Sequence, residues 1–329
     1  MKMYSEKQNQ ISISEIGSFF SGGRIITLEG QPTREVQVAR NAKPRFVDLN
    51  GDYVTGQAYV QFTRQAKPVF DSPLMFWHGG AMTGVTWETT PDGRPGWQMY
   101  FLRKGFDTYV CDAVERGRAG WSPYPEIYDT SPIFRTRNEA WSLFRFGPAS
   151  SCKDENRLAA SFPELKFPIE QLDYFCSQFV PRWTDHGAIT LDAYYAAVEK
   201  IGPVWLVAHS QGGNFALEAA AKHPELFRGV VVIEPASAPA DIGNAAQVPH
   251  LFVWGDYIGG SETWKGYRAQ VDAYVAQLQD LGGNVEIIDL PALGIVGNSH
   301  VPMMDSNSDQ VADQVFDWIK RNDNELGEN

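Results

Sequence analysis

Cysteine is scarce in this chain of 329 residues, which contains only Cys111, Cys152 and Cys176. An odd number of cysteines cannot form a complete disulfide framework, so the fold is not expected to depend on one. A single bridge between Cys152 and Cys176 stays open for an oxidising compartment, but free, buried thiols are the favoured interpretation.

Long apolar runs and blocks of basic residues are also missing. No apolar run approaches the ~20 residues of a membrane-spanning helix, and residues 1–7 lack the apolar core of a secretory signal. The chain as given is therefore expected in the cytoplasm, or in the periplasm or outside the cell if a signal has been removed. The formal net charge of −12, without a Lys/Arg block, argues against nucleic acid or an anionic membrane as a partner.

The chain does contain alternating strand-like and helix-like segments. Its hydrophobic content of 43% is that of a globular protein. Antiparallel opening strands are expected at residues 24–28, 35–38 and 58–62. Buried strands are expected at residues 73–77, 108–112, 204–208, 229–234, 250–256 and 285–290. Helices are expected at residues 96–104, 190–201 (with Thr190 as N-cap), 214–222, 265–281 and 308–321.

This alternation predicts the α/β class, with a mostly parallel central sheet flanked by helices in one domain over residues 1–329. Its ligand site is expected at the carboxyl ends of the strands. Residues 121–188 break the rhythm, because they are rich in proline and aromatic residues without a clear period. Since irregular stretches of this length are usually functional, we interpret them as a cap or lid inserted over the site.

Ser210 stands at the most informative position of the chain. It lies between the strand expected at residues 204–208 and the helix expected at residues 214–222, with the small residues Ala208 and Gly212 two positions to either side. This pattern is typical of the nucleophile elbow of α/β-hydrolases, whose turn is too tight for a larger side chain. The helix points its N-terminal amides at the serine, where negative charge develops. An ordinary surface serine is the alternative.

A serine nucleophile needs a general base, which in this arrangement follows the last strand. Three histidines come after the serine: His223, His250 and His300. His223 ends a helix as a surface residue, and His250 opens a strand at the wrong end of the sheet. His300 lies in a polar loop past the last strand, so it is the expected base, the alternative being a solvent-exposed loop histidine.

Two carboxylates compete to orient this histidine. Asp256 follows the strand after which this fold most often carries its acid, but Tyr257 and Ile258 occupy the usual position a little further on. Glu234 follows four apolar residues at the end of the preceding strand, where an acid is costly to bury without a partner. Because a glutamate can also reach from there, we expect Glu234 to be the acid and Asp256 to stabilise a turn.

An oxyanion hole needs preorganised N–H donors. One is expected from Gln211, directly after the serine, and a second from Gly80, with Ala81 as a possible assistant. Glycines in this loop let the backbone approach the substrate closely, and His78 is interpreted as a structural residue that ties the loop down. The expected pocket residues are Gly79, Ala81, Trp87 and Trp97, with walls from the aromatic stretches of residues 121–188. So aromatic a pocket suggests a bulky apolar or aromatic substrate.

Several segments resemble one bacterial family. The runs FWHGGAMTG (76–84), TWETTPDGRPG (86–96), GSFFSGGR (17–24) and GIVGNSH (294–300), the last followed by Asp305, are similar to the esterase 713 family. That family includes the sulfonylurea-herbicide de-esterifying esterases, and the likeness spans nearly the whole chain.

The resemblance implies a serine esterase of the α/β-hydrolase fold. Ser210 and His300 match the family's nucleophile and base, and the family's glutamate acid agrees with Glu234. Family members look like homodimers whose site is covered by aromatic and loop elements. This chain departs at Gly80 and Ala81, where the esterase that names the family carries two adjacent cysteines, so no local bridge stiffens the loop.

The sequence thus predicts a serine carboxylesterase that works through an acyl-enzyme, as a homodimer, with a small-molecule ester substrate and neither metal nor organic cofactor. Small-alcohol esters of bulky aromatic acids are expected. A neutral ester is favoured because the chain is acidic, although Arg94, Arg116 and Arg118 could offer local relief. A lactonase, thioesterase or amidase could use the same residues. A haloalkane dehalogenase would need a carboxylate in place of Ser210, and a non-catalytic binding protein usually loses a member of the triad.

Overall fold

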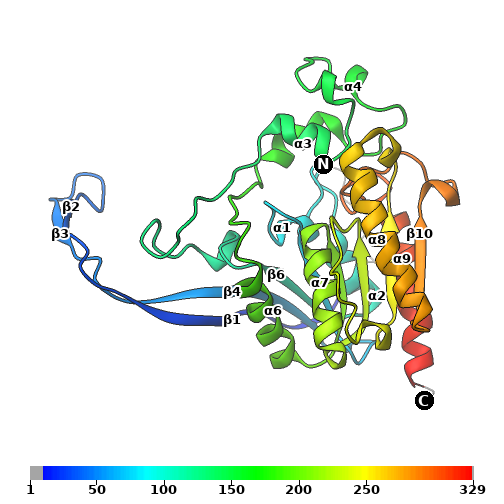
Figure 1. Cartoon of the computed structure of the whole chain (residues 1–329), viewed down its shortest axis with the longest axis horizontal. Coiled ribbons are helices and arrows are strands. Elements are labelled where there is room, and N and C mark those ends of the chain that lie inside the picture. The colour runs from blue at the N-terminus through cyan, green and yellow to red at the C-terminus, as the bar shows by residue number, and fades with distance from the viewer. Residues whose placement is uncertain (1–9, 328–329) are drawn as a thin grey trace.

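The computed structural model describes residues 10–327, so the interpretation of residues 1–7 lies outside the described part of the chain. An eight-stranded sheet with the order β1-β4-β6-β5-β7-β8-β9-β10 forms its centre (Figure 1). Neighbouring strands from β6 to β10 run parallel, whereas β4 lies antiparallel to both β1 and β6. The strands are β1 Ile13–Leu28, β4 Gly51–Gln65, β5 Leu74–Trp77, β6 Thr108–Asp112, β7 Val204–His209, β8 Phe227–Ile233, β9 His250–Trp254 and β10 Val285–Asp289.

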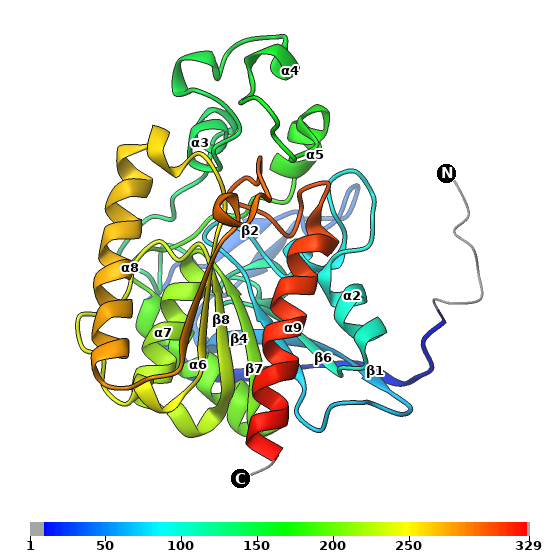
Figure 2. The ribbon, with the colours of Figure 1, turned by 90° about the vertical axis from the view of Figure 1, so that its right-hand side faces the viewer.

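Helices cover both faces of this sheet (Figure 2). One face carries α6 (Gly187–Ile201), α7 (Gln211–Lys222) and α8 (Glu262–Asp280), and the other carries α2 (Trp97–Lys104) and α9 (Ser308–Gly327). In β7, Leu206 and Ala208 pack into the first core, whereas Trp205 and Val207 pack into the second. Successive strand residues face opposite sides, so a strand covered on both faces is a continuous apolar run. The fold is the predicted α/β-hydrolase fold.

A long insertion connects β6 to α6 and lies over the carboxyl ends of the parallel strands (Figure 2). Its helices are short: α3 Arg137–Leu143, α4 Arg157–Ala160 and α5 Leu172–Cys176. Stacked phenylalanines form its core, with the rings of Phe146 and Phe167 4.1 Å apart. This insertion contains most of residues 121–188, and its lack of a helical period in the sequence reflects the shortness of these elements.

The antiparallel pair β1 and β4 extends beyond the body of the molecule as an arm (Figure 1). The short strands β2 (Arg34–Val36) and β3 (Arg45–Val47) pair at its tip. Large apolar side chains on the arm are exposed to solvent, including Ile25 at 69%, Val54 at 68% and Phe46 at 73%. The sequence predicted strands that overlap β1, β2 and β4, but it predicted neither the full length of β1 and β4 nor the short strand β3.

Two local expectations meet different outcomes. Thr190 is not the N-cap of α6, because the helix begins at Gly187 and the Thr190 hydroxyl donates within the first turn to the carbonyl of His186 at 3.0 Å. Such side-chain to backbone bonds make a first-turn threonine resemble a cap. The three cysteines are free, with Cys111 buried and Cys152 and Cys176 partly buried.

Candidate active site

Ser210 occupies a tight turn between β7 and α7. Its backbone has φ 51° and ψ −116°, a region that costs a non-glycine residue roughly 1–3 kcal/mol and that is found mainly at functional sites. Small neighbours allow this turn, since a Cβ on Gly212 would lie 2.6 Å from the carbonyl oxygen of His78. The turn therefore brings the loop after β5 directly against the start of α7.

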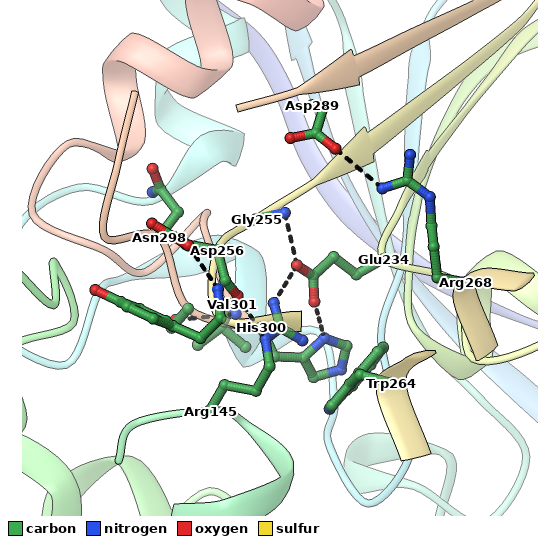
Figure 3. A network of polar contacts seen from close by, with 12 residues as sticks. Arg145, Glu234, Gly255, Asp256, Trp264, Arg268, Asp289, Asn298, His300 and Val301 are labelled. Atoms are coloured by element: carbon green, nitrogen blue, oxygen red, sulfur yellow. Dashed lines mark hydrogen bonds and ion pairs between the residues drawn. The ribbon is translucent and has the colours of Figure 1, made fainter. Parts of the chain in front are cut away.

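Glu234 and His300 are in contact beside this turn (Figure 3). Nδ1 of His300 donates to Oε2 of Glu234 at 2.5 Å, and both side chains are buried. Asp256, the competing acid, forms no hydrogen bond with the His300 ring. Its carboxylate accepts the backbone N–H groups of Tyr257 at 2.7 Å and Gly297 at 2.9 Å. The structure thus brings His300 to Glu234 and places Asp256 in the turn after β9.

Arg145 is the residue of this network that the sequence did not point to. It belongs to the insertion, its side chain is 1% exposed, and its Nη2 donates to Oε1 of Glu234. Its Nε donates to the carbonyl of Asp256 at 2.7 Å, and the guanidinium lies 4.7 Å over the ring of Trp264. Gly255 gives Glu234 a further donor, a backbone N–H at 2.7 Å. Both carboxylate oxygens of Glu234 are thereby satisfied, although its side chain has no exposed surface.

The charges of this network follow from burial and pairing. Burial alone would raise the pKa of Glu234, but the Arg145 charge and the hydrogen bond from His300 lower that pKa to about 2. Burial lowers the pKa of His300 to about 4, against the opposing effect of Glu234. At neutral pH the pair therefore consists of an ionised glutamate and a neutral imidazole with Nδ1 protonated. Nε2 of such an imidazole is an acceptor, which is what a general base requires.

Backbone contacts fix the position of the His300 loop. The ring of His209 donates from Nε2 to the His300 carbonyl at 2.8 Å, and the His300 N–H donates to the carbonyl of Phe144 at 3.0 Å. Buried Asp305 accepts both the N–H and the hydroxyl of Ser299, at 2.8 and 2.7 Å. His209 and Asp305 thus hold the loop in place, a role that their sequence positions beside Ser210 and His300 could have indicated.

The loop after β5 carries Gly80, one of the two expected oxyanion donors, and the start of α7 carries the other. Gln211 is the first residue of α7, so its N–H has no partner within the helix. Ala81 has φ 60° and its carbonyl accepts the Val180 N–H at 3.1 Å, which ties this loop to the insertion. His78 is buried and accepts the Ala113 N–H at 3.0 Å on Nε2, and burial lowers its pKa to about 4. It is thus a neutral residue that anchors the loop.

A cavity of about 230 Å³ brings most of these groups together. Ser210, His300, Gly80 and Gln211 all line it, and the insertion contributes part of its wall. Its full lining is Gly80, Met82, Arg135, Leu143, Phe144, Arg182, His209, Ser210, Gln211, Asn214, Ala236, Trp264, Tyr267 and His300. The aromatic wall therefore comes from Phe144, Trp264 and Tyr267.

Trp87 and Trp97 do not line this cavity, and their prediction as pocket residues is wrong. Both are fully buried in the core on the α2 and α9 face, with ring centroids 6.0 Å apart. Trp97 donates from its indole to the carbonyl of Ser308 at 3.2 Å. Gly79 and Ala81 flank the cavity residue Gly80 without lining the cavity themselves. Trp87 and Trp97 are close to the oxyanion loop in the sequence, but their side chains point into the core on one face of the sheet and not into the cavity.

Within residues 10–327, no group of three or more His, Cys, Asp or Glu side chains is arranged to hold a metal ion. The described part of the chain also has no helix that is both long and apolar enough to cross a membrane.

Comparison with known proteins gives concordant results. Residues 199–282 match the family model described as alpha/beta hydrolase fold. A solved structure of a novel bacterial esterase is 32% identical with a TM-score of 0.80, over 95% of this chain and 98% of the other. The probable secreted lipase phiG of a fungal species (strain ATCC 74256) is 25% identical over 358 residues, covering 84% of this chain and 89% of that protein.

Proposed function

Because this chain belongs to the α/β-hydrolase family and is an esterase, a carboxylic ester hydrolase, we propose that Ser210, His300 and Glu234 are its catalytic triad. The observation that carries the proposal is the 2.5 Å contact between Nδ1 of His300 and Oε2 of Glu234, beside a cavity that Ser210 and His300 both line. We also propose that the chain belongs to the esterase 713 family, on the motifs described above.

The proposed reaction follows the charges of the site. Neutral His300 accepts the Ser210 proton on Nε2 while Oγ attacks the ester carbonyl, and ionised Glu234 stabilises the imidazolium that forms. The N–H groups of Gly80 and Gln211 would hold the oxyanion. His300 then protonates the leaving alcohol, and water hydrolyses the acyl-enzyme by the same steps. Arg145 holds Glu234 ionised and in place, and the insertion over residues 121–188 acts as a cap.

The shape of the cavity favours small alcohols on aromatic acids. Its volume of about 230 Å³ lies below the ~300–1,000 Å³ typical of sites for drug-sized ligands, so the cavity holds the ester group and an aromatic ring while the rest of a larger acid extends out of its open side. Phe144, Trp264 and Tyr267 offer aromatic surface to an aryl acid. We therefore propose methyl or ethyl esters of aromatic acids as substrates, with sulfonylurea-type esters as one member of this class.

The test compares Ser210→Ala with the unchanged enzyme on a panel of lactones, thioesters, amides, and esters with short, long and aromatic acyl groups, read by acid release. We expect a loss of several orders of magnitude in kcat, with about 10³–10⁴-fold catalysis over water remaining from the oxyanion hole and binding. A serine-directed phosphonate should inactivate the unchanged enzyme, and it should not reduce the residual rate of Ser210→Ala. Near-normal turnover by the variant would refute the triad. A preference for lactones, thioesters, amides or long acyl chains would refute the substrate assignment.

We further propose a homodimer in which the arm of β1 and β4 contributes the interface. Exposed apolar surface of this extent typically marks an association site, and Ile25, Val54 and Phe46 are each exposed by about two thirds or more. Light scattering at micromolar concentration should give twice the chain mass, and Ile25→Lys with Val54→Lys should give the monomer mass. A monomer without any substitution would refute this assembly.

A further inference from the structure

Two arginines line the cavity without a carboxylate among its lining residues. Arg182 makes no side-chain hydrogen bond or ion pair with any residue between 10 and 327. Arg135 has a 5% exposed side chain, and its Nε is buried without a hydrogen-bond partner. Arg135 forms an ion pair with Glu139 at 3.0 Å, but Glu139 does not line the cavity and its side chain is 48% exposed. Both guanidinium groups therefore have donors to spare inside the cavity.

A third arginine, Arg116, is close enough to these two to be repelled by them, but it does not line the cavity. Arg116 is buried, and its Nε and Nη1 have no partner in the described part of the chain. Burial, followed by repulsion from Arg182, lowers the pKa of Arg116 to about 10. The neighbouring acid Glu115 accepts a 2.8 Å hydrogen bond from the ring of His186. Burying like charges with unused donors is unfavourable unless an anion arrives to compensate them.

The position of the two lining arginines relates them to the reacting bond. A Cβ on Gly80 would lie 2.2 Å from Nη1 of Arg182, so this guanidinium lies directly beside the proposed oxyanion donor. Nη2 of Arg135 lies 3.5 Å from the carbonyl oxygen of the same Gly80. Because both arginines line the same cavity as Ser210, an anionic group bound by them would belong to the substrate and lie close to its ester carbonyl. The net charge of −12 describes the whole chain and not this cavity.

We propose that the physiological ester carries a free carboxylate close to its scissile bond, as in a monoester of an aromatic dicarboxylic acid, and that Arg135 and Arg182 bind it. The planar guanidinium matches a carboxylate in a two-point contact. The inference rests on the proposed esterase function and deepens it, and it replaces the expectation of a neutral substrate. The aromatic wall takes the ring, and the two arginines take the second acid group.

The first test needs no substitution: it compares monomethyl phthalate with methyl benzoate on the unchanged enzyme. Hydrogen bonds to charged groups contribute enough to expect a kcat/KM about tenfold or more in favour of the phthalate ester. Free phthalate should inhibit hydrolysis of methyl benzoate competitively, and added salt should weaken that inhibition. Equal kcat/KM values, or no inhibition by phthalate, would overturn the proposal while leaving the esterase intact.

The second test locates the carboxylate. Arg182→Gln and Arg135→Gln should each abolish most of the preference for the phthalate ester, mainly through its KM, and Arg182→Lys should restore part of it. Arg137→Gln is the matched control, because Arg137 lies on the same insertion but pairs with Asp173 on the surface, with 48% of its side chain exposed. It should keep the preference.

Two outcomes separate this inference from its premise. A loss of kcat on both esters with the preference retained would make Arg182 a stabiliser of the oxyanion and overturn the carboxylate site. Phthalate binding to Ser210→Ala, measured by calorimetry, should persist in a protein that no longer hydrolyses esters. If the unchanged enzyme cleaved neither ester but still bound phthalate, the proposed reaction would fail and the anion site would stand.

Discussion

Replacing Arg145 by methionine is the most direct test of the buried network. The substitution removes the charge that holds Glu234 ionised, and Glu234 has no exposure through which water could replace it. Removing one partner of a buried ion pair costs about 3–5 kcal/mol. The pKa of Glu234 points in the same direction: burial would raise it, whereas the Arg145 charge and the bonds from His300 and Arg145 lower it to about 2, so the ionised form depends on Arg145.

The pH dependence gives this prediction its sign. A carboxylate whose pKa is lower in the folded protein contributes stability above its unfolded pKa of 4.5, and loses it as the pH falls toward 2. The difference in unfolding free energy between the unchanged protein and Arg145→Met should therefore be largest above the raised pKa that Glu234 has in the variant, and shrink steadily as the pH falls from there toward 2. Activity should fall as well, and the acid limb of its pH profile should move to higher pH, because burial then raises the pKa of Glu234.

Urea unfolding at several pH values measures this difference, with Arg321→Met as the control. Arg321 pairs with Glu286 on the surface, with the two side chains 55% and 44% exposed, and such a pair contributes about 0–1 kcal/mol. A loss for Arg145→Met no larger than the control, or one that does not shrink on acidification, would refute the reasoning.

Three further predictions concern the same site and its scaffold. Glu234→Gln should lower kcat far more than Asp256→Asn, because only Glu234 contacts His300 and supports the charge that forms on it. Asp256 accepts backbone N–H groups instead. Steady-state kinetics that gave the reverse order would make Asp256 the acid of the triad. With the pKa of His300 lowered to about 4, kcat/KM should rise with pH around that value, and a midpoint at the ordinary histidine pKa would contradict the burial argument. Gly212→Ala should lower the melting temperature and the activity, because its Cβ would lie 2.6 Å from a backbone carbonyl oxygen. Gly266→Ala in α8, where nothing lies within 4 Å, should stabilise by about 0.5–1 kcal/mol, and equal effects of the two substitutions would contradict the steric argument.

The order of strands and helices and the turn at Ser210 were predictable because the signals are local. A strand covered on both faces is an apolar run, and the elbow joins strand, serine and helix within adjacent residues. The contact between Glu234 and His300 was also predicted, although the residues are far apart in the sequence. An acid directly after a buried strand needs a partner, and the topology of parallel strands brings both residues to one edge of the sheet.

Contacts of the insertion could be learned only from the tertiary structure. Arg145, Arg135 and Arg182 lie in a segment without a regular period, so nothing in their spacing indicates that Arg145 pairs with Glu234 or that the other two line the cavity. The tryptophans show the same limit from the other side: Trp87 and Trp97 are near the oxyanion loop in sequence, yet they pack on the opposite face of the sheet from Trp264. The sequence by itself determined the fold and the tight turn at Ser210, because those depend on local pattern and strand order. The pairing of Arg145 with Glu234 and the local charge of the cavity were decided by how an irregular segment packs over the sheet, which depends on long-range contacts.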